Sequence, residues 1–237
     1  MTRRRWIADE YSGNQAALTG KHAEHLARVL RARIGQEFDI AAGGQIRRGS
    51  ITAVSEDRVE FQLAEVVPAN AFTSITLLLA IFKFDRMEWA IEKCTELGVA
   101  RVVPIIARRT DRHLAAAAAK RAERWRRIAR QASEQSRRIA PPSISAPVRV
   151  KDAVALPATP GILLAESEGQ LHLKDALQMH SPNEDLVLAI GPEGGWTEEE
   201  VALFVAAGWV PASLGHTVLR SETAAIAATA MVVSELF

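Results

Sequence analysis

The hydrophobic pattern of the first seventy residues is that of short strands. β-rich runs alternate there with turn signals at Gly43-Gly44 and Ser55-Glu56-Asp57. The predicted strands are 38–40, 46–54 and 58–66. Before them, residues 21–32 place apolar side chains at helical spacing. We therefore predict a small β domain with one short helix at residues 1–70, closed by a linker at 68–70.

After residue 74 the pattern changes to longer apolar runs separated by helices. A strand is predicted at 75–81, a helix at 86–97 that Gly98 ends, and a second strand at 101–106. Strand, helix and strand in this order form a βαβ unit, which implies a parallel sheet. A long helix is predicted at 114–139, ahead of two prolines.

The last third of the chain continues this alternation. Strands are predicted at 161–165, at 186–190 and around 212–214. Thr197, with Glu200 three residues later, forms a capping box that opens a helix, and Gly208 closes it. A final helix is predicted at 222–236. We therefore predict an α/β fold whose second domain covers residues 73–237.

Composition is that of an ordinary globular protein, but the charges are unevenly distributed. Of the 237 residues, 48% are hydrophobic and 24% are charged, and the formal net charge is +1. Residues 71–150 nevertheless carry 16 basic and 7 acidic side chains, whereas residues 151–237 carry 3 and 12. Such asymmetry indicates contact with a polyanion. The alternative is a solvated basic face on helix 114–139, where Arg121, Arg124, Arg127 and Arg130 form a stripe.

Several classes of protein are excluded by what the sequence lacks. The single cysteine, Cys94, rules out an internal disulfide, and its spacing predicts a buried helix position. The six histidines show no metal-ligand spacing, so no metal is expected. No run of about 18 apolar residues occurs, and no apolar segment follows the basic N-terminus. We therefore expect a cytoplasmic protein with no membrane span.

Two stretches near the end of the chain offer a ligand site. In residues 188–197 and 214–223 an apolar strand runs into a glycine-containing loop and then a helix start. Ligands of open α/β sheets bind at such strand ends. Glycines there let backbone groups approach a ligand, which suits recognition of an adenine edge. Residues 191–195 match neither a dinucleotide fingerprint nor a P-loop, and a tight turn needing two glycines is the alternative.

Five motifs in a fixed order give the chain a family resemblance. They are His25-Leu26-Ala27-Arg28-Val29-Leu30-Arg31, Arg86-Met87-Glu88-Trp89 with Lys93-Cys94-Thr95-Glu96-Leu97-Gly98-Val99, Glu134-Gln135-Ser136-Arg137-Arg138, Gly191-Pro192-Glu193-Gly194-Gly195 and Leu219-Arg220-Ser221-Glu222-Thr223. With them the sequence resembles the RsmE family of ribosomal RNA methyltransferases, in the SPOUT superfamily, over essentially the whole chain.

This resemblance implies both a fold and a reaction. It implies a PUA-like RNA-binding β-barrel at 1–70 and a SPOUT α/β domain at 73–237 with a deep trefoil knot. It further implies a homodimer that binds S-adenosyl-L-methionine in the knot loops. The reaction implied is methylation of N3 of a uridine in the 16S rRNA of the 30S ribosomal subunit.

The resemblance also implies site residues. The cofactor-binding residues would be Leu164, Ala165, Glu166, Ile190, Gly191, Pro192, Glu193, Gly194, Gly195, Leu214, Gly215, Val218 and Leu219. The catalytic candidates are Arg220, given the electrostatic role, and Glu222; the base stays unassigned. The alternatives are that Glu222 is only a helix-terminal charge and that Arg220 is only its salt-bridge partner. RNA-binding candidates are Arg3, Arg4, Arg5, Arg28, Arg31, Arg121, Arg124, Arg127, Arg137 and Arg138, with Trp6 and Trp125 as possible stacking partners or core residues.

One departure and two rival functions stand beside this interpretation. Thr217 occupies a position where family members often carry an arginine, so a contact made by that side chain is in doubt. A SPOUT ribose 2′-O-methyltransferase would act on a hydroxyl, and the motifs at 93–98 and 134–137 speak against it. A non-catalytic rRNA-binding assembly protein would not need the glycine loop 191–195.

Overall fold

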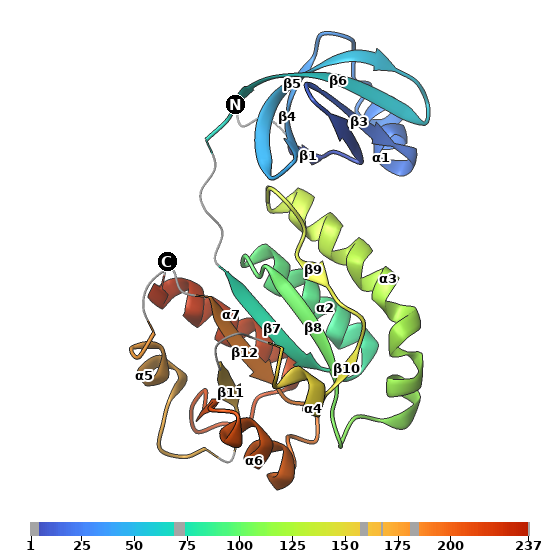
Figure 1. The fold of residues 1–237 in the computed structure, drawn as a ribbon. Coiled ribbons are helices and arrows are strands. Elements are labelled where there is room, and N and C mark those ends of the chain that lie inside the picture. Colours follow the sequence, from blue (N-terminus) through green and yellow to red (C-terminus); the bar gives the residue numbers. More distant parts are fainter. Residues whose placement is uncertain (1–4, 69–73, 157–160, 167, 181–184, 237) are drawn as a thin grey trace. The chain divides into compact units, whose positions relative to one another are not determined.

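The computed structural model of the chain divides into two compact units (Figure 1). It describes residues 5–68, 74–156, 161–166, 168–180 and 185–236. The first unit consists of residues 1–71 with 133–140, and the second of residues 72–132 with 141–237. Each unit has its own sheet and its own core.

A six-stranded sheet in the order β1-β4-β5-β6-β3-β2 forms the first unit. Its strands are β1 (Arg5–Ile7), β2 (Glu10–Ser12), β3 (Gln15–Thr19), β4 (Glu37–Ala42), β5 (Gln45–Val54) and β6 (Arg58–Val66). Neighbouring strands are antiparallel, except that β1 runs parallel to β4. The sheet curls into a half-barrel (Figure 1), and the register of β5 against β6 shifts twice, where bulges increase the twist.

Alternate side chains of these strands form the core of the first unit. Phe38, Ile40, Ile51 and Phe61 are buried together with Trp6, which is a core residue rather than an exposed stacking surface. The predicted strands correspond to β4, β5 and β6. The pattern does not predict β1, β2 or β3, because strands of three to five residues show too little alternation.

The helix expected at 21–32 is divided. Helix α1 (Gly20–Glu24) continues into one π-helical turn at His25–Val29. The apolar spacing therefore indicates helix correctly, but it does not distinguish an α-helical turn from the wider π-helical one. Leu26 of this segment is fully buried against the sheet.

Residues 133–140 belong to the first unit, whereas the predicted boundary places them in the second. His22 Nε2 lies 3.6 Å from Glu134 Oε1, and Arg5 Nη1 donates a hydrogen bond to the carbonyl oxygen of Arg137. These residues continue from α3 (Arg112–Gln135), a helix that begins in the second unit. A hydrophobic pattern cannot reveal such a change of unit within a helix.

A parallel sheet in the order β10-β8-β7-β12-β11-β13, with β9 paired to β8, is the centre of the second unit. Its strands are β7 (Ile75–Ala80), β8 (Arg101–Ile106), β9 (Ser143–Ile144), β10 (Val148–Arg149), β11 (Ile162–Leu164), β12 (Leu186–Ile190) and β13 (Val210–Ala212). The predicted strands match β7, β8, β11 and β12, and β13 lies two residues earlier than expected. All five residues of β12 are buried, because both faces of the sheet are covered.

Helices cover the two faces of this sheet (Figure 1). They are α2 (Phe84–Glu96), α3, α4 (Val150–Ala153), α5 (Leu173–Leu177), α6 (Glu198–Ala206) and α7 (Ser221–Leu236). Leu77 and Leu79 of β7 pack with α2, α3, α5 and α7, whereas Leu78 and Ala80 pack with α4 and α6. Alternation along one apolar strand thus supplies both cores.

The core beneath α2 also contains Cys94 and Trp125. Cys94 is fully buried next to Thr229 of α7, and burial raises the pKa of its thiol to about 12. This confirms the predicted buried helix position. Trp125 is fully buried as well, so it is a core residue and not a base-stacking one. Within the described residues no helix is long and apolar enough to span a membrane, and the trefoil knot stays a prediction.

Candidate active site

A cavity of about 590 Å³ lies where β11, β12 and β13 end. Its volume falls in the range of small-molecule and cofactor sites. Three loops supply much of its wall: the loop after β11, the loop between β12 and α6, and the loop between β13 and α7; residues of α6 and of the start of α7 complete it with Arg109. The sequence places a ligand site at the carboxyl ends of parallel strands, and the cavity lies there.

Most of the predicted cofactor-binding residues line this cavity. They are Leu164, Ala165, Glu166, Ile190, Gly191, Pro192, Gly195, Leu214, Gly215, Val218 and Leu219. Glu193 and Gly194 belong to the same loop but are not part of the wall. The structure thus brings together three segments that are some twenty-five residues apart along the chain, although their contact with a cofactor stays a proposal.

The glycines of the second loop are required by close packing. A Cβ on Gly191 would lie 3.1 Å from Nε1 of Trp196, and this indole donates a hydrogen bond of 3.0 Å to the carbonyl oxygen of Leu164. Gly195 has φ +69°, and a Cβ there would lie 2.7 Å from Oε1 of Glu166. The loop is therefore held tightly against the first loop, with its backbone at the cavity.

Arg109 is a cavity residue that the sequence interpretation missed. Its Nη1 donates hydrogen bonds to the carbonyl oxygens of Gly194, at 2.6 Å, and Trp196, at 3.3 Å. It therefore fixes the second loop through the main chain. Arg109 lies in the basic part of the chain, residues 71–150, and no local signal in the sequence distinguishes it from the neighbouring arginines.

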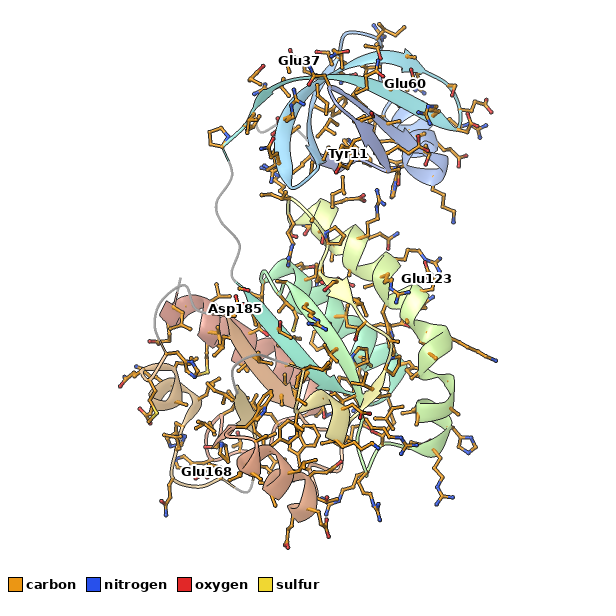
Figure 2. The ribbon with its side chains drawn as sticks, in the orientation of Figure 1. Tyr11, Glu37, Glu60, Glu123, Glu168 and Asp185 are labelled. Carbon is orange, nitrogen blue, oxygen red and sulfur yellow. The ribbon has the colours of Figure 1, made fainter. Side chains whose placement is uncertain are left out.

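Two short structures shape the ends of the loops. The capping box at α6 is confirmed: Thr197 accepts from the backbone N–H of Glu200, whose carboxylate accepts from the backbone N–H of Thr197. After β11, Glu168 (Figure 2) accepts hydrogen bonds from the backbone N–H groups of Gln170 and Leu171. These bonds, first that from Gln170, lower the pKa of Glu168.

The two catalytic candidates differ in environment. Arg220 is exposed, and its side chain makes no hydrogen bond or ion pair with the part of the chain that the structure describes. Glu222 is buried in the first turn of α7, and its Oε1 lies 3.7 Å from Nε of Arg86. Arg86 also donates a hydrogen bond of 3.1 Å to Glu193. Neither candidate lines the cavity, but Leu219 and Ser221 beside them do.

The RNA-binding candidates fall into three groups. Arg3 and Arg4 lie outside the described residues. Exposed or partly exposed candidates are Arg5, Arg28, Arg31, Arg121, Arg124, Arg127 and Arg137. Arg138 is only 4% exposed, and burial lowers the pKa of its guanidinium to about 10; this burial argues against a contact with the RNA backbone, and that role stays a prediction. Arg138 follows the end of α3 at Gln135, so the helical spacing of the arginines along α3 does not predict whether its side chain faces solvent.

Several of the exposed arginines already have partners. Glu88 accepts hydrogen bonds from both Arg121 and Arg124, and Arg28 pairs with Glu24 and Glu56. Such exposed pairs contribute little to stability and can exchange for phosphate. On α3, the helix that carries Arg121 and Arg124, Glu123 projects outward (Figure 2) and pairs with Arg126, which is not an RNA-binding candidate.

Two other candidates have an uncommon backbone. Arg31 (φ 51°) and Arg137 (φ 60°) are the non-glycine residues with positive φ in the described chain. That conformation costs on the order of 1–3 kcal/mol and is found preferentially at functional sites. It supports a functional role for both arginines. Among the same described residues, no three His, Cys, Asp or Glu side chains are grouped so that they could hold a metal ion.

Fold and site together define an α/β protein with a ligand-sized cavity at the carboxyl ends of three parallel strands. A model of the RNA methyltransferase domain matches residues 69–233. The chain belongs to the ribosomal RNA small subunit methyltransferase E family, RsmE. It is therefore a methyltransferase.

Relatives and solved structures agree with this assignment. The chain is 34% identical to ribosomal RNA small subunit methyltransferase E of Synechocystis over 91% of its length and 71% of the relative's. The Bacillus subtilis protein of the same name is 30% identical, over 88% and 85% of the two chains. A Neisseria gonorrhoeae enzyme of this name, solved with S-adenosyl methionine bound, has a TM-score of 0.83 and 28% identity, covering 97% and 96%.

A second solved structure gives the same fold and the same cofactor. It is a Legionella pneumophila protein in complex with S-adenosylmethionine, with a TM-score of 0.84 and 30% identity over 99% of this chain and 98% of that one. The predicted combination of an N-terminal β domain and a C-terminal parallel α/β domain is therefore confirmed.

Proposed function

We propose that this protein transfers a methyl group from S-adenosyl-L-methionine to N3 of a uridine in 16S rRNA. The observation that supports it most directly is the cavity at the ends of β11, β12 and β13, whose wall contains the loops that the family resemblance assigns to the cofactor. Family membership supplies the substrate class, since the curated relatives are named for small-subunit rRNA.

The residues of the cavity fit this cofactor. An adenine ring needs an apolar slot edged by backbone groups, and Ile190, Leu214 and Leu219 provide both. Gly191 packs closely against Trp196 and Gly195 has a left-handed backbone, so both keep the main chain close to the cavity. When bound, the cofactor supplies a methyl group on a positively charged sulfur. The chain supplies Glu166 as a cavity carboxylate that can accept hydrogen bonds from it.

Catalysis in this proposal depends mainly on alignment and charge. The loops hold the methyl donor while the target base is brought in line with it, and positioning of two reactants contributes a large part of such a rate. Loss of the N3 proton leaves negative charge on the uracil. Arg220, exposed and without a partner among the described residues, is available to stabilise that charge.

The remaining parts of the proposal concern partners. We assign the exposed arginines of the first unit and of α3 to the RNA backbone, each phosphate contact adding a salt-dependent increment. We also infer a homodimer, on the family resemblance, and a cytoplasmic location, because the substrate is ribosomal. A target base inside folded rRNA has to be turned out of its stack to reach the cavity.

Two rival functions can be separated from this one by experiment. Modification mapping of 16S rRNA from cells lacking the protein should show the loss of one N3-methyluridine. If the protein were a ribose 2′-O-methyltransferase, its loss would leave the N3-methyluridine in place, and one ribose methyl group would be missing from the rRNA instead. Calorimetry with S-adenosylmethionine separates an enzyme from an assembly protein, because the latter should take up no cofactor. Unchanged 16S rRNA in the deletion strain would refute the proposal.

A further inference from the structure

Arg86 of helix α2 contacts two segments that adjoin the cavity, the loop between β12 and α6 and the first turn of α7. Arg86 Nη1 donates to Glu193 Oε1 at 3.1 Å, and Arg86 Nε lies 3.7 Å from Glu222 Oε1. Glu193 follows Pro192 and Glu222 follows Ser221 along the chain, and Pro192 and Ser221 both line the cavity. The Arg86 cluster therefore adjoins the site at which methyl transfer would take place.

Glu222 differs from the other acidic residues of this region because it is buried and incompletely paired. Its side chain is 6% exposed, and its Oε2 is buried without a hydrogen-bond partner among the described residues. The 3.7 Å separation from Arg86 is also too long for a hydrogen bond. An unsatisfied buried acceptor destabilises the folded protein, and more so when it is charged. Such a group calls for a ligand, which must donate an N–H or O–H because a carboxylate only accepts.

We propose that Glu222 is the proton acceptor of the reaction and that Arg86 is its positioning residue; this inference rests on the function proposed above. The N3–H of uracil is the donor that the reaction has to remove. Its proton passes to Glu222 Oε2, and the electron pair left on N3 forms the bond to the methyl carbon. The carbon–sulfur bond of the donor breaks with its electrons on sulfur, giving S-adenosylhomocysteine. Protonated Glu222 then releases its proton to water.

The geometry of Arg86 suits positioning rather than direct chemistry. Its hydrogen bond goes to Glu193, so the guanidinium places a positive charge beside Glu222 but leaves Oε2 unoccupied. Arg86 is 30% exposed, whereas the side chain of Glu222 is only 6% exposed. Because it contacts Glu193 and Glu222, Arg86 links the loop between β12 and α6 to the first turn of α7.

The test compares Glu222→Gln with a control on α2. The control is Lys93→Gln. Like Arg86, Lys93 is a cation of α2 that contacts two carboxylates, Glu92 and Glu96, each at 2.8 Å, but neither of these belongs to a segment that lines the cavity. Methyl transfer to 16S rRNA in purified small subunits is followed at pH 7, with the Kd for S-adenosylmethionine from calorimetry. We expect Glu222→Gln to lower kcat by about 100-fold or more, the usual contribution of a positioned base. The Kd should stay within about threefold, and Lys93→Gln should match the wild type.

A dependence on pH separates a lost base from a disturbed structure. Without Glu222 the reaction needs uracil that has already lost its N3 proton to solvent, a fraction that rises about tenfold per pH unit below the pKa of the uracil. The deficit of Glu222→Gln should therefore shrink as the pH rises. It should also shrink with RNA containing 5-fluorouridine, whose N3–H is more acidic. A deficit that is the same at every pH would overturn the inference.

The Arg86 variants test the positioning role separately. Arg86→Gln should lower kcat by about tenfold or more with KM for S-adenosylmethionine little changed, and Arg86→Lys should recover part of the loss because it restores the charge. Equal kcat in Arg86→Gln and the wild type would overturn the positioning role of Arg86. If Glu222→Gln does not fold, the Arg86 variants still test the inference. A wild-type enzyme that forms no N3-methyluridine would refute the proposed function and this inference with it, whereas a wild-type rate in Glu222→Gln refutes only the inference.

Discussion

At the residue scale, the cavity depends on positions where any side chain would disturb the fold. Gly195 combines a left-handed backbone with a neighbour, Glu166, that a Cβ would meet at 2.7 Å. Gly169 lies in the loop after β11 and has open space around it. The two glycines look alike in the sequence, but only Gly195 has a left-handed backbone, which a residue with a side chain rarely adopts.

This contrast gives a prediction about cofactor affinity. We expect Gly195→Ala to weaken the binding of S-adenosylmethionine by about tenfold or more, because the strained backbone and the displaced Glu166 both change the cavity wall. Gly169→Ala should bind as the wild type does. Calorimetry on both variants measures this, and equal affinity in the two would show that Gly195 does not shape the site.

Cys94 gives a second prediction at the same scale. Burial raises the pKa of its thiol to about 12, so the reactive thiolate is scarce at neutral pH and a reagent cannot reach it. In the native protein Cys94 should therefore stay unmodified by a thiol reagent at pH 8. One thiol per chain should react once denaturant unfolds the protein. Rapid labelling of the native protein would contradict the burial of α2 against α7.

At the scale of elements, one carboxylate joins a helix start to a neighbouring loop. Glu200 closes the capping box of α6 with one oxygen, and its other oxygen accepts from the backbone N–H of Arg108 at 2.7 Å. Arg109, the next residue, holds the loop before α6. The local signal for a helix start therefore also organises one wall of the cavity, through contacts across ninety residues.

The capping box leads to a prediction about stability. Thr197→Ala removes the acceptor for the backbone N–H of Glu200 and should lower the free energy of unfolding by about 1 kcal/mol. Thr217→Ala, at an exposed loop position, should change it by less than about 0.5 kcal/mol. Urea denaturation followed by circular dichroism measures both. Equal midpoints for the two variants would show that the cap does not stabilise α6.

At the scale of the whole molecule, charge is divided between parts of the chain. Basic side chains are concentrated in residues 71–150 and acidic ones in 151–237, so a net charge of +1 conceals two strongly charged segments. The structure adds that some basic residues are paired and Arg138 is buried. Only the exposed arginines can therefore contribute to RNA binding.

The salt dependence of RNA binding tests this distribution. The affinity for 16S rRNA should fall steeply with salt, and Arg127→Gln should reduce the slope of log K against log salt by about 0.7–0.9, the value for one phosphate contact. Arg58→Gln should leave the slope unchanged, because Arg58 is paired with Glu10 and Glu60 and is not an RNA-binding candidate. Fluorescence anisotropy over a salt series measures it, and a flat response in the wild type would disprove the electrostatic surface.

The sequence by itself determined the order of the main strands and helices of the second unit and the place of the loops that line the cavity. Strands β7, β8 and β12 and the capping box of α6 follow from local periodicity and end signals, which act over only a few residues. Glycine-containing loops after parallel strands identify the cavity for the same reason. The five ordered motifs, in turn, identify the family.

Only the tertiary structure decided which distant residues meet. Arg86 contacts Glu193 and Glu222, Arg109 fixes the loop that contains Gly194, and residues 133–140 join the first unit. Each of these contacts joins segments far apart in the chain, so no periodicity or spacing records it. Burial has the same origin, because whether Trp125 or Arg138 meets solvent depends on what the rest of the chain places over it.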